Sequence, residues 1–229
     1  MWGREVDGRA LTFHLAGINN QNFLMRDDET GTYWQQISGQ AISGPLRGRV
    51  LPFVHSDELS VRIWRAEQPQ GRVLAPVVKY SSQYEEKDWD KKMDKAKSIL
   101  DFPNSGLPMR EEVFGIFNAS GSRAFPVKKV LSDKLVLDHV GSEPVLLVVG
   151  PDNLSVRAFR NTSPPRDFYA FPGSSDFLFQ DTQTGTRWNF KGCPISGSGA
   201  CLEPVAMVKD YWFDWKNYHP ATTIYARRR

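Results

Sequence analysis

The stretches FLMRDDETGTYW (Phe23–Trp34) and FLFQDTQTGTRW (Phe177–Trp188) are near copies of each other, and they decide the fold prediction. In each, an Asp follows an apolar segment, and Thr-Gly-Thr and a Trp follow the Asp at the same spacing. The Asp can accept hydrogen bonds from backbone N–H groups of a turn, and the Gly supplies the positive φ of a hairpin loop with a bulge. The motif therefore predicts two structural β-hairpin turns and not a duplicated active site. Its residues are Asp27, Gly31 and Trp34 in the first copy and Asp181, Gly185 and Trp188 in the second.

The similarity continues beyond the two turns. The offset between matching residues falls only from 154 at Asp27 and Asp181 to 151 at Trp64 and Trp215, so few insertions separate the copies. Such a long ordered match indicates duplication followed by divergence. We therefore expect a partial first unit over residues 1–79, a charged helical linker over 80–112 and a complete second unit over 113–229.

Five apolar or β-branched segments separated by turn sequences precede the second copy of the motif and predict strands. The first copy begins at a piece that matches only the end of the last segment, so either the chain is truncated or its first unit has an open edge. An open edge invites self-association. The fold class that follows is mainly β, with antiparallel sandwich or barrel-like sheets and a few short helices. The predicted strands are Val113–Phe117, Arg123–Val127, Lys134–Val140, Pro144–Val149 and Leu154–Phe159.

Three short helices are also predicted. Apolar residues at helical spacing among mixed charges predict one helix within Asp88–Leu100. A second is expected within SDELSVRIWRAEQP (56–69), with Ser56 as its N-cap, and a third in the matching KDYWFDWKNYHP (209–220).

Composition argues against several classes of protein. The chain of 229 residues has a net charge of +3, and its basic residues are scattered apart from the terminal ARRR, so a nucleic-acid role is disfavoured. Its longest apolar run, Pro144–Gly150, is the length of a strand, and no membrane span is predicted. The N-terminal residues lack the basic and apolar regions of a signal peptide.

Reactive patterns are few. The four histidines have no ligand spacing, so no metal site is predicted. The Gly-rich segments 39–48 and 192–201 lack the Lys-Ser/Thr of a phosphate loop and predict tight turns. Cys193 and Cys201 are compatible with a disulfide and equally with two thiols. The candidate ligand-binding residues are aromatic, with core burial as the favoured alternative: Trp64, Trp212 and Trp215, together with His219.

A longer series of motifs gives the chain a family resemblance. LTFHLAG (11–17), the first turn motif, VFGIFNASGSRAFPVKKV (113–130) and DWKNYHPATTIY (214–225) resemble the uncharacterised, mostly microbial domain of unknown function 3179 over nearly the whole chain. The resemblance implies a Cys-Pro-x-Cys motif at the end of an apolar strand, and often an export signal. Here GPDN (Gly150–Asn153) stands at the equivalent place in the second half, and in the first half that place would precede Met1.

These observations predict a non-enzymatic binding or structural module, and the resemblance places it outside the cytoplasm although this chain shows no signal peptide. The alternative is a redox or metal-dependent enzyme whose Cys-Pro-x-Cys motif lies outside this chain. The sequence identifies neither a cofactor nor a ligand, and it leaves any catalytic residue unassigned.

Overall fold

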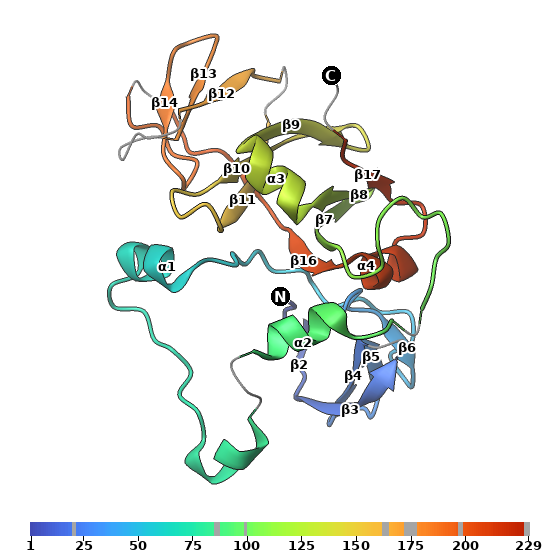
Figure 1. Ribbon diagram of the computed structural model, residues 1–229. Coiled ribbons are helices and arrows are strands. Elements are labelled where there is room, and N and C mark those ends of the chain that lie inside the picture. The colour runs from blue at the N-terminus through green and yellow to red at the C-terminus, as the bar shows by residue number, and fades with distance from the viewer. Residues whose placement is uncertain are drawn as a thin grey trace.

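The computed structural model of the protein is mainly β, with several antiparallel sheets and few short helices, which confirms the predicted fold class (Figure 1). In the parts of the chain that the structure describes, no helix has the length and apolar character to cross a bilayer. The described residues are 1–19, 22–84, 88–98, 100–161, 165–171, 178–196 and 199–226. Predictions that involve Ile99, Phe177, Gly197, Ser198 or Arg227–Arg229 lie outside them.

The N-terminal part forms a small sheet of its own, drawn in blue in Figure 1. A hairpin, β1 and β2, leads into a four-stranded antiparallel sheet in the order β3-β4-β5-β6. Trp34 and Leu11 are fully buried in its core, and the ring of Phe13 meets that of Trp34 edge-on at 5.9 Å. The strands are β1 Glu5–Val6, β2 Arg9–Ala10, β3 Phe13–Asn19, β4 Asn22–Asp27, β5 Tyr33–Gln35 and β6 Ala41–Ser43.

Two further four-stranded sheets pack against each other in the middle of the molecule. One has the order β16-β7-β8-β17, with β17 parallel to β8, and the other has the order β15-β11-β10-β9. The five strands predicted between residues 113 and 159 are all present, with boundaries displaced by at most two residues. The strands are β7 Glu112–Asn118, β8 Gly121–Pro126, β9 Leu135–Val140, β10 Glu143–Val149, β11 Val156–Arg160, β15 Pro204–Val205, β16 Val208–Tyr211 and β17 Thr223–Ile224.

Strand β10 is buried on both faces, which explains why its sequence is apolar without interruption. Leu147 packs into the core between the two sheets, whereas its neighbours Leu146 and Val148 face the other way. On that second side a three-stranded sheet, β12-β13-β14, covers them with Phe179 and Trp188. This third sheet lies at the top of Figure 1 and consists of β12 Phe168–Ala170, β13 Phe179–Asp181 and β14 Arg187–Trp188.

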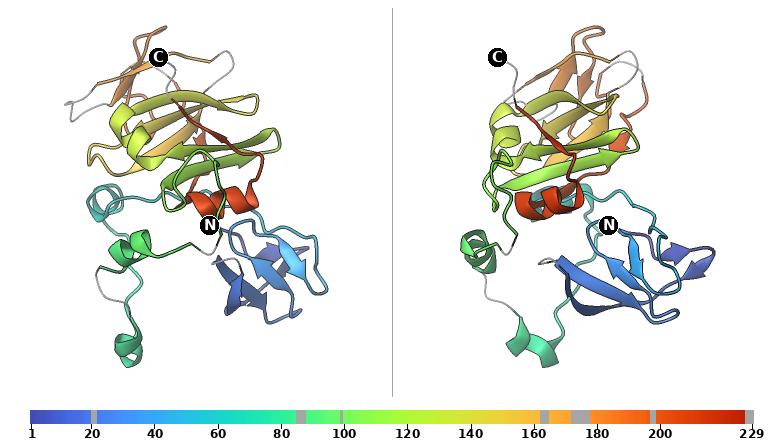
Figure 2. Two further views of the ribbon diagram at one scale, coloured as in Figure 1. Left: turned by 45° about the vertical axis from the view of Figure 1, so that its right-hand side comes forward. Right: turned by 90° about the vertical axis from the view of Figure 1, so that its right-hand side faces the viewer.

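Helix α4 (Trp212–Tyr218) covers the outer face of β7 and β8. Trp212 and Trp215 are completely buried there, and a Cβ on Gly115 would lie 2.2 Å from the Trp215 ring, so only glycine fits at that position. The same helix lies next to the N-terminal sheet (Figure 2), where the Asn22 amide donates to Asp214 at 2.5 Å. Helix α4 therefore joins the two halves of the molecule.

The segment that connects β6 to β7 (residues 44–111) is called the connecting segment. It contains α1 (Val61–Glu67), a 3₁₀ helix (Val78–Gln83) and α2 (Trp89–Lys95). The prediction that Ser56 caps α1 is wrong. Ser60 is the N-cap, and its Oγ accepts a hydrogen bond from the Ile63 N–H at 3.3 Å. Ser56 lies before the helix in irregular chain, because its neighbour Asp57 is held by an ion pair to strand β11.

Helix α3 (Val127–Asp133), between β8 and β9, was not predicted. The sequence pattern predicts that the preceding strand continues to Val127, whereas in the structure Val127 begins the helix. Val127 and Val130 are its buried residues. A helix of two turns shows too little periodicity to be distinguished from the end of a strand.

Candidate functional site

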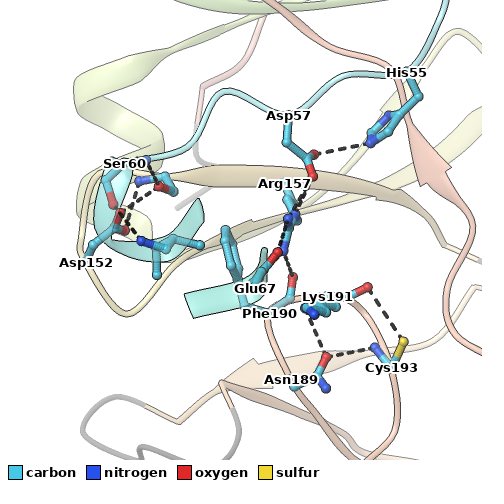
Figure 3. Close-up of polar contacts among 12 residues, drawn as sticks. His55, Asp57, Ser60, Glu67, Asp152, Arg157, Asn189, Phe190, Lys191 and Cys193 are labelled. Atoms are coloured by element: carbon cyan, nitrogen blue, oxygen red, sulfur yellow. Dashed lines mark hydrogen bonds and ion pairs between the residues drawn. The ribbon is translucent and has the colours of Figure 1, made fainter. Parts of the chain in front are cut away.

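Two adjoining cavities lie where the connecting segment passes strand β11. Their volumes are about 330 and 240 Å³, and His55, Asp57, Arg157 and Ala158 belong to the walls of both. Together they reach the size range of small-molecule sites. Figure 3 shows the polar side chains that build the wall between them.

Arg157 on β11 is the centre of this wall. Its Nη1 and Nη2 donate to the two carboxylate oxygens of Glu67 on α1, both at 2.8 Å, and its Nε donates to Asp57 Oδ2 at 2.9 Å. Nη2 lies 2.7 Å from the same Asp57 oxygen, and Nη1 reaches the Phe190 carbonyl at 3.5 Å. The guanidinium also lies over the Phe190 ring, 4.6 Å from its centre.

All three nitrogens of this guanidinium are engaged, by four hydrogen bonds and by the ion pair of Nη2 with Asp57. Burial by itself would lower the pKa of Arg157, but the hydrogen bonds that it donates to Glu67 and Asp57 outweigh this and raise the pKa. Arg157 therefore holds a permanent positive charge that is already paired within the wall. It fixes α1 and the preceding segment onto the sheet.

His55 is a side chain of the wall that can meet a ligand. Its Nε2 lies 3.2 Å from Asp57 Oδ1, the carboxylate oxygen that Arg157 does not use. A carboxylate on one ring nitrogen orients the imidazole and leaves the other nitrogen for a further hydrogen bond. His55 borders both cavities, so a ligand in either could reach this ring.

The larger cavity combines an apolar floor with charged groups at its edge. Lys209 lies 2.8 Å from Glu112 and 3.7 Å from Glu58. Burial would lower the pKa of Lys209, but these ion pairs raise it, so the ammonium stays charged. The floor is formed by Phe114, Val156, Val205, Met207 and Val208.

A tight turn forms a separate group of polar contacts around Asp152 and Ser60 in Figure 3. Asp152 accepts hydrogen bonds from the Leu154 and Ser155 N–H groups and from the Ser155 hydroxyl, whose oxygen accepts the Ser60 N–H at 2.9 Å. Burial opposes ionisation, but these hydrogen bonds lower the pKa of Asp152 to about 2. This turn is the GPDN segment (Gly150–Asn153), and an ionised Asp organises it.

Of the residues predicted to bind a ligand, three lie together and Trp64 lies apart from them. Trp64 is half-buried on α1, whereas Trp212 and Trp215 of α4 are in the core against β7 and β8. Trp212 Nε1 donates to Ser105 and Trp215 Nε1 to Thr222, and the tilted His219 ring lies 4.0 Å from the Trp215 ring. None of the four belongs to the walls of the two cavities beside Arg157.

The two Thr-Gly-Thr turns have the same internal structure. Asp27 Oδ1 accepts the Thr30 N–H at 2.5 Å, and Asp27 Oδ2 accepts the Trp34 indole N–H at 2.7 Å. In the second turn the corresponding distances, from Thr184 and Trp188 to Asp181, are 2.6 and 3.3 Å. Burial would raise the pKa of either Asp, but these hydrogen bonds lower it, so both carboxylates are ionised.

Replacing Gly31 with Ala is expected to lower the free energy of unfolding by about 1–2 kcal/mol, because Gly31 has a φ of +71° that costs an L-residue about this much. Gly17→Ala is the matched control, since Gly17 lies in open space in the same sheet and has no positive φ. Urea unfolding of both variants tests the structural role. A Gly31 variant of unchanged stability would contradict it.

The residues of the cavity wall were not found from sequence. Arg157 is 100 residues from Asp57 and 90 from Glu67 in the chain, and no local pattern links it to them. The cysteines are joined: Cys193 and Cys201 form a disulfide across the loop after β14. Among the described residues, no group of three or more His, Cys, Asp or Glu side chains is placed to hold a metal ion.

Comparison with known proteins gives one match. The family model described as "Protein of unknown function (DUF3179)" matches residues 1–222, which include both turn motifs and the walls of both cavities. Neither the curated proteins nor the solved structures contain a match to this chain. The match covers nearly the whole sequence and confirms the resemblance seen in the motifs. The chain therefore belongs to the DUF3179 family.

Proposed function

We propose that the protein is a non-enzymatic binding or structural module that acts outside the cytoplasm. The observation that carries the proposal is the pair of cavities beside His55, whose shared wall is held by the ion pairs of Arg157. A wall fixed before the ligand arrives reduces the ordering cost of binding.

The disulfide between Cys193 and Cys201 supports the location, because disulfides persist mainly in oxidising compartments. Cell fractionation with thiol labelling tests this part of the proposal. Both cysteines should resist labelling, and the protein should be in the envelope or secreted fraction. A cytosolic protein with two reactive thiols would overturn the assigned location.

The charges around the larger cavity favour a small zwitterion. Carboxylates of Asp57 and Glu58 and the ammonium of Lys209 stand at the edge of an apolar floor. A free amino acid or dipeptide has both charges and an apolar part within the available volume. Electrostatic complementarity of this kind sets specificity more than affinity.

Titration calorimetry with glycine, alanine, aspartate, lysine and glycylglycine tests the proposal. At least one should bind, and His55→Ala should weaken that binding about fivefold or more, the effect of one hydrogen bond of ~1 kcal/mol. His14→Ala is the matched control, because His14 also faces a carboxylate, Asp28 at 2.8 Å, but lies in the N-terminal sheet. Equal effects of the two changes, or no binding by the wild type, would contradict a site at His55.

The alternative function is a redox or metal-dependent enzyme whose Cys-Pro-x-Cys motif lies outside this chain. It makes a different prediction about purified full-length protein. Stoichiometric copper, iron or zinc by elemental analysis would favour the enzyme over the binding module.

We also propose that the chain consists of two related units, residues 1–79 and 113–229, joined by a helical linker over 80–112. Equivalent backbone contacts outside the turns support this. The Gly3 N–H donates to the Pro52 carbonyl as the Arg160 N–H donates to that of Glu203, both at 2.8 Å. Expression of residues 113–229 alone tests the division: a cooperative unfolding transition is expected, and failure to fold would contradict it.

A further inference from the structure

The two Thr-Gly-Thr turns differ in what surrounds them. In the N-terminal sheet Thr32 is fully buried, and its Oγ1 accepts a hydrogen bond from the Leu46 N–H at 3.2 Å. The corresponding Thr186 is half-buried. Among the described residues, no backbone N–H donates to the Thr186 hydroxyl oxygen. The second turn therefore borders space that is filled in the first.

That space is a cavity of about 610 Å³. Arg166 in its wall lies two residues before Phe168, which pairs with Asp181. In the N-terminal sheet the residue at that position, two before Phe13, is Leu11, which is fully buried. An arginine thus replaces a core leucine at the edge of the cavity. The wall also contains Arg160, Thr184, Thr186, Trp188, Leu202, the segment 199–201 and Glu203, whose carboxylate is paired with Arg160.

Arg166 has hydrogen-bond donors to spare. Its guanidinium lies over the Trp188 ring at 5.8 Å, and its Nη1 is 3.9 Å from Asp181 Oδ2, too far for a hydrogen bond. The neighbouring Arg160 is already paired with Glu143 at 2.9 Å and with Glu203 at 3.1 Å. Of the two described arginines in the wall, Arg166 is the one whose guanidinium can take a further anion.

The backbone of Arg166 is held in place. Its N–H donates to Asn161 Oδ1 at 2.9 Å, and its carbonyl accepts from Asn161 Nδ2 at 2.8 Å. Asn161 is itself almost completely buried. The guanidinium is therefore presented from a fixed point of the wall, and its planar fork suits a carboxylate.

Thr186 complements Arg166 with an acceptor. The Thr184 hydroxyl donates to the ionised Asp181 at 2.8 Å, so its oxygen must accept the proton of Thr186 across their 2.7 Å contact. The Thr186 oxygen keeps a lone pair, the one that its counterpart Thr32 uses for the Leu46 N–H. A ligand hydroxyl could donate to it.

We propose that this cavity binds a small hydroxylated carboxylate of the sugar-acid class. Its carboxylate pairs with the Arg166 guanidinium, and one of its hydroxyls donates to Thr186 Oγ1. The volume suits a monosaccharide. This site goes beyond the proposed function at His55, and it shares no residue with the cavities described there.

Titration calorimetry of the intact protein with sodium D-glucuronate tests the proposal, with D-glucose and acetate as probes that lack the carboxylate and the hydroxyls respectively. Glucuronate should bind most tightly of the three. Arg166→Leu, which installs the residue of the N-terminal sheet, should weaken glucuronate binding about tenfold or more, and Thr186→Val should weaken it less.

Arg72→Leu is the control, because Arg72 is an exposed residue of the connecting segment outside this cavity. Melting temperatures establish that Arg166→Leu is folded, and its binding of amino acids at His55 should be unchanged. No saturable glucuronate binding by the wild type would overturn the proposal. So would unchanged binding by Arg166→Leu, or equal binding of glucuronate and glucose.

Discussion

Replacing Arg157 with Met should lower the free energy of unfolding by about 3–5 kcal/mol, the cost of removing one partner from a buried ion pair. The change deletes every contact of the guanidinium and leaves Asp57 and Glu67 close together without a cation. The Arg157 side chain is 9% exposed and that of Glu67 is 16% exposed, so solvent screens the repulsion poorly. Urea unfolding at pH 7 measures the loss.

Compensating changes separate lost charge from lost packing. Adding Asp57→Asn and Glu67→Gln to Arg157→Met removes the stranded carboxylates, and most of the stability should return. Arg62→Met is the matched control, because Arg62 lies on α1, the helix that carries Glu67. Its guanidinium makes an exposed hydrogen bond to the Pro151 carbonyl at 3.3 Å. If the triple variant were no more stable than Arg157→Met, the electrostatic account would be wrong.

The same variant bears on function. Arg157 fixes both the segment that carries His55 and the helix that carries Glu67, so its loss should free one wall of each cavity. Amino-acid binding should weaken in Arg157→Met even where the protein is fully folded. Glucuronate binding beside Arg166 should not change, because that cavity lies against other residues.

How far the sequence predicts this molecule depends on the distance between interacting residues. The turn motif contains its own partners within seven residues, from Asp27 to Trp34, so its spacing alone indicated the hairpin. The run that forms β10 indicated a strand from its own apolar and β-branched residues. Arg157, by contrast, is a single polar residue in the predicted strand LSVRAF. Its partners come from a different part of the chain, so the local sequence does not indicate them.

The cavity beside Arg166 was missed for a related reason. The sequence match of the two turn motifs pairs Asp27 with Asp181, but the residues before each turn differ too much to align by sequence. Strand pairing reveals that Leu11 and Arg166 are equivalent. Comparison of the two stretches by sequence indicates what a hairpin needs, whereas the exchange of Leu11 for Arg166 is found only from the strand pairing.

A second large effect should come from two carboxyl groups at the joint between the halves of the molecule. Asp210 is the third residue of β16, and Asp214 lies four residues later in α4, where the Asn22 amide of the N-terminal sheet donates to it at 2.5 Å. Burial, and then the negative charge of Asp214, raises the pKa of Asp210 to about 8. Burial also raises the pKa of Asp214, to about 6, although hydrogen bonds from Asn22 and Asp210 oppose this. Near pH 7 the pair therefore holds a proton that the unfolded chain has lost.

The sign of the pH dependence follows from these values. Because the folded pKa of Asp210 lies above its unfolded value of 3.8, stability is lost as pH rises towards about 8. Other groups nearby act differently: Arg110 lowers the pKa of Asp214, and half-buried His219, whose pKa burial lowers to about 4, favours folding as pH rises to 6.5. The loss should thus be clearest between pH 6.5 and 8, at about 1.4 kcal/mol per pH unit for one proton.

Asp210→Asn isolates this effect, because the amide cannot ionise and can still donate to Asp214. The free energy of unfolding of the variant minus that of the wild type should grow steadily from pH 6.5 to 8. Burial lowers the pKa of His219 and of the Met1 amino group, and the subtraction cancels the contributions of both groups. Asp152→Asn is the control, since a pKa of about 2 leaves that group ionised across the whole window. It should shift the stability curve without changing its slope. A constant difference between Asp210→Asn and wild type would mean that Asp210 is ionised at neutral pH, and the contact between α4 and the N-terminal sheet would then have to tolerate two negative charges.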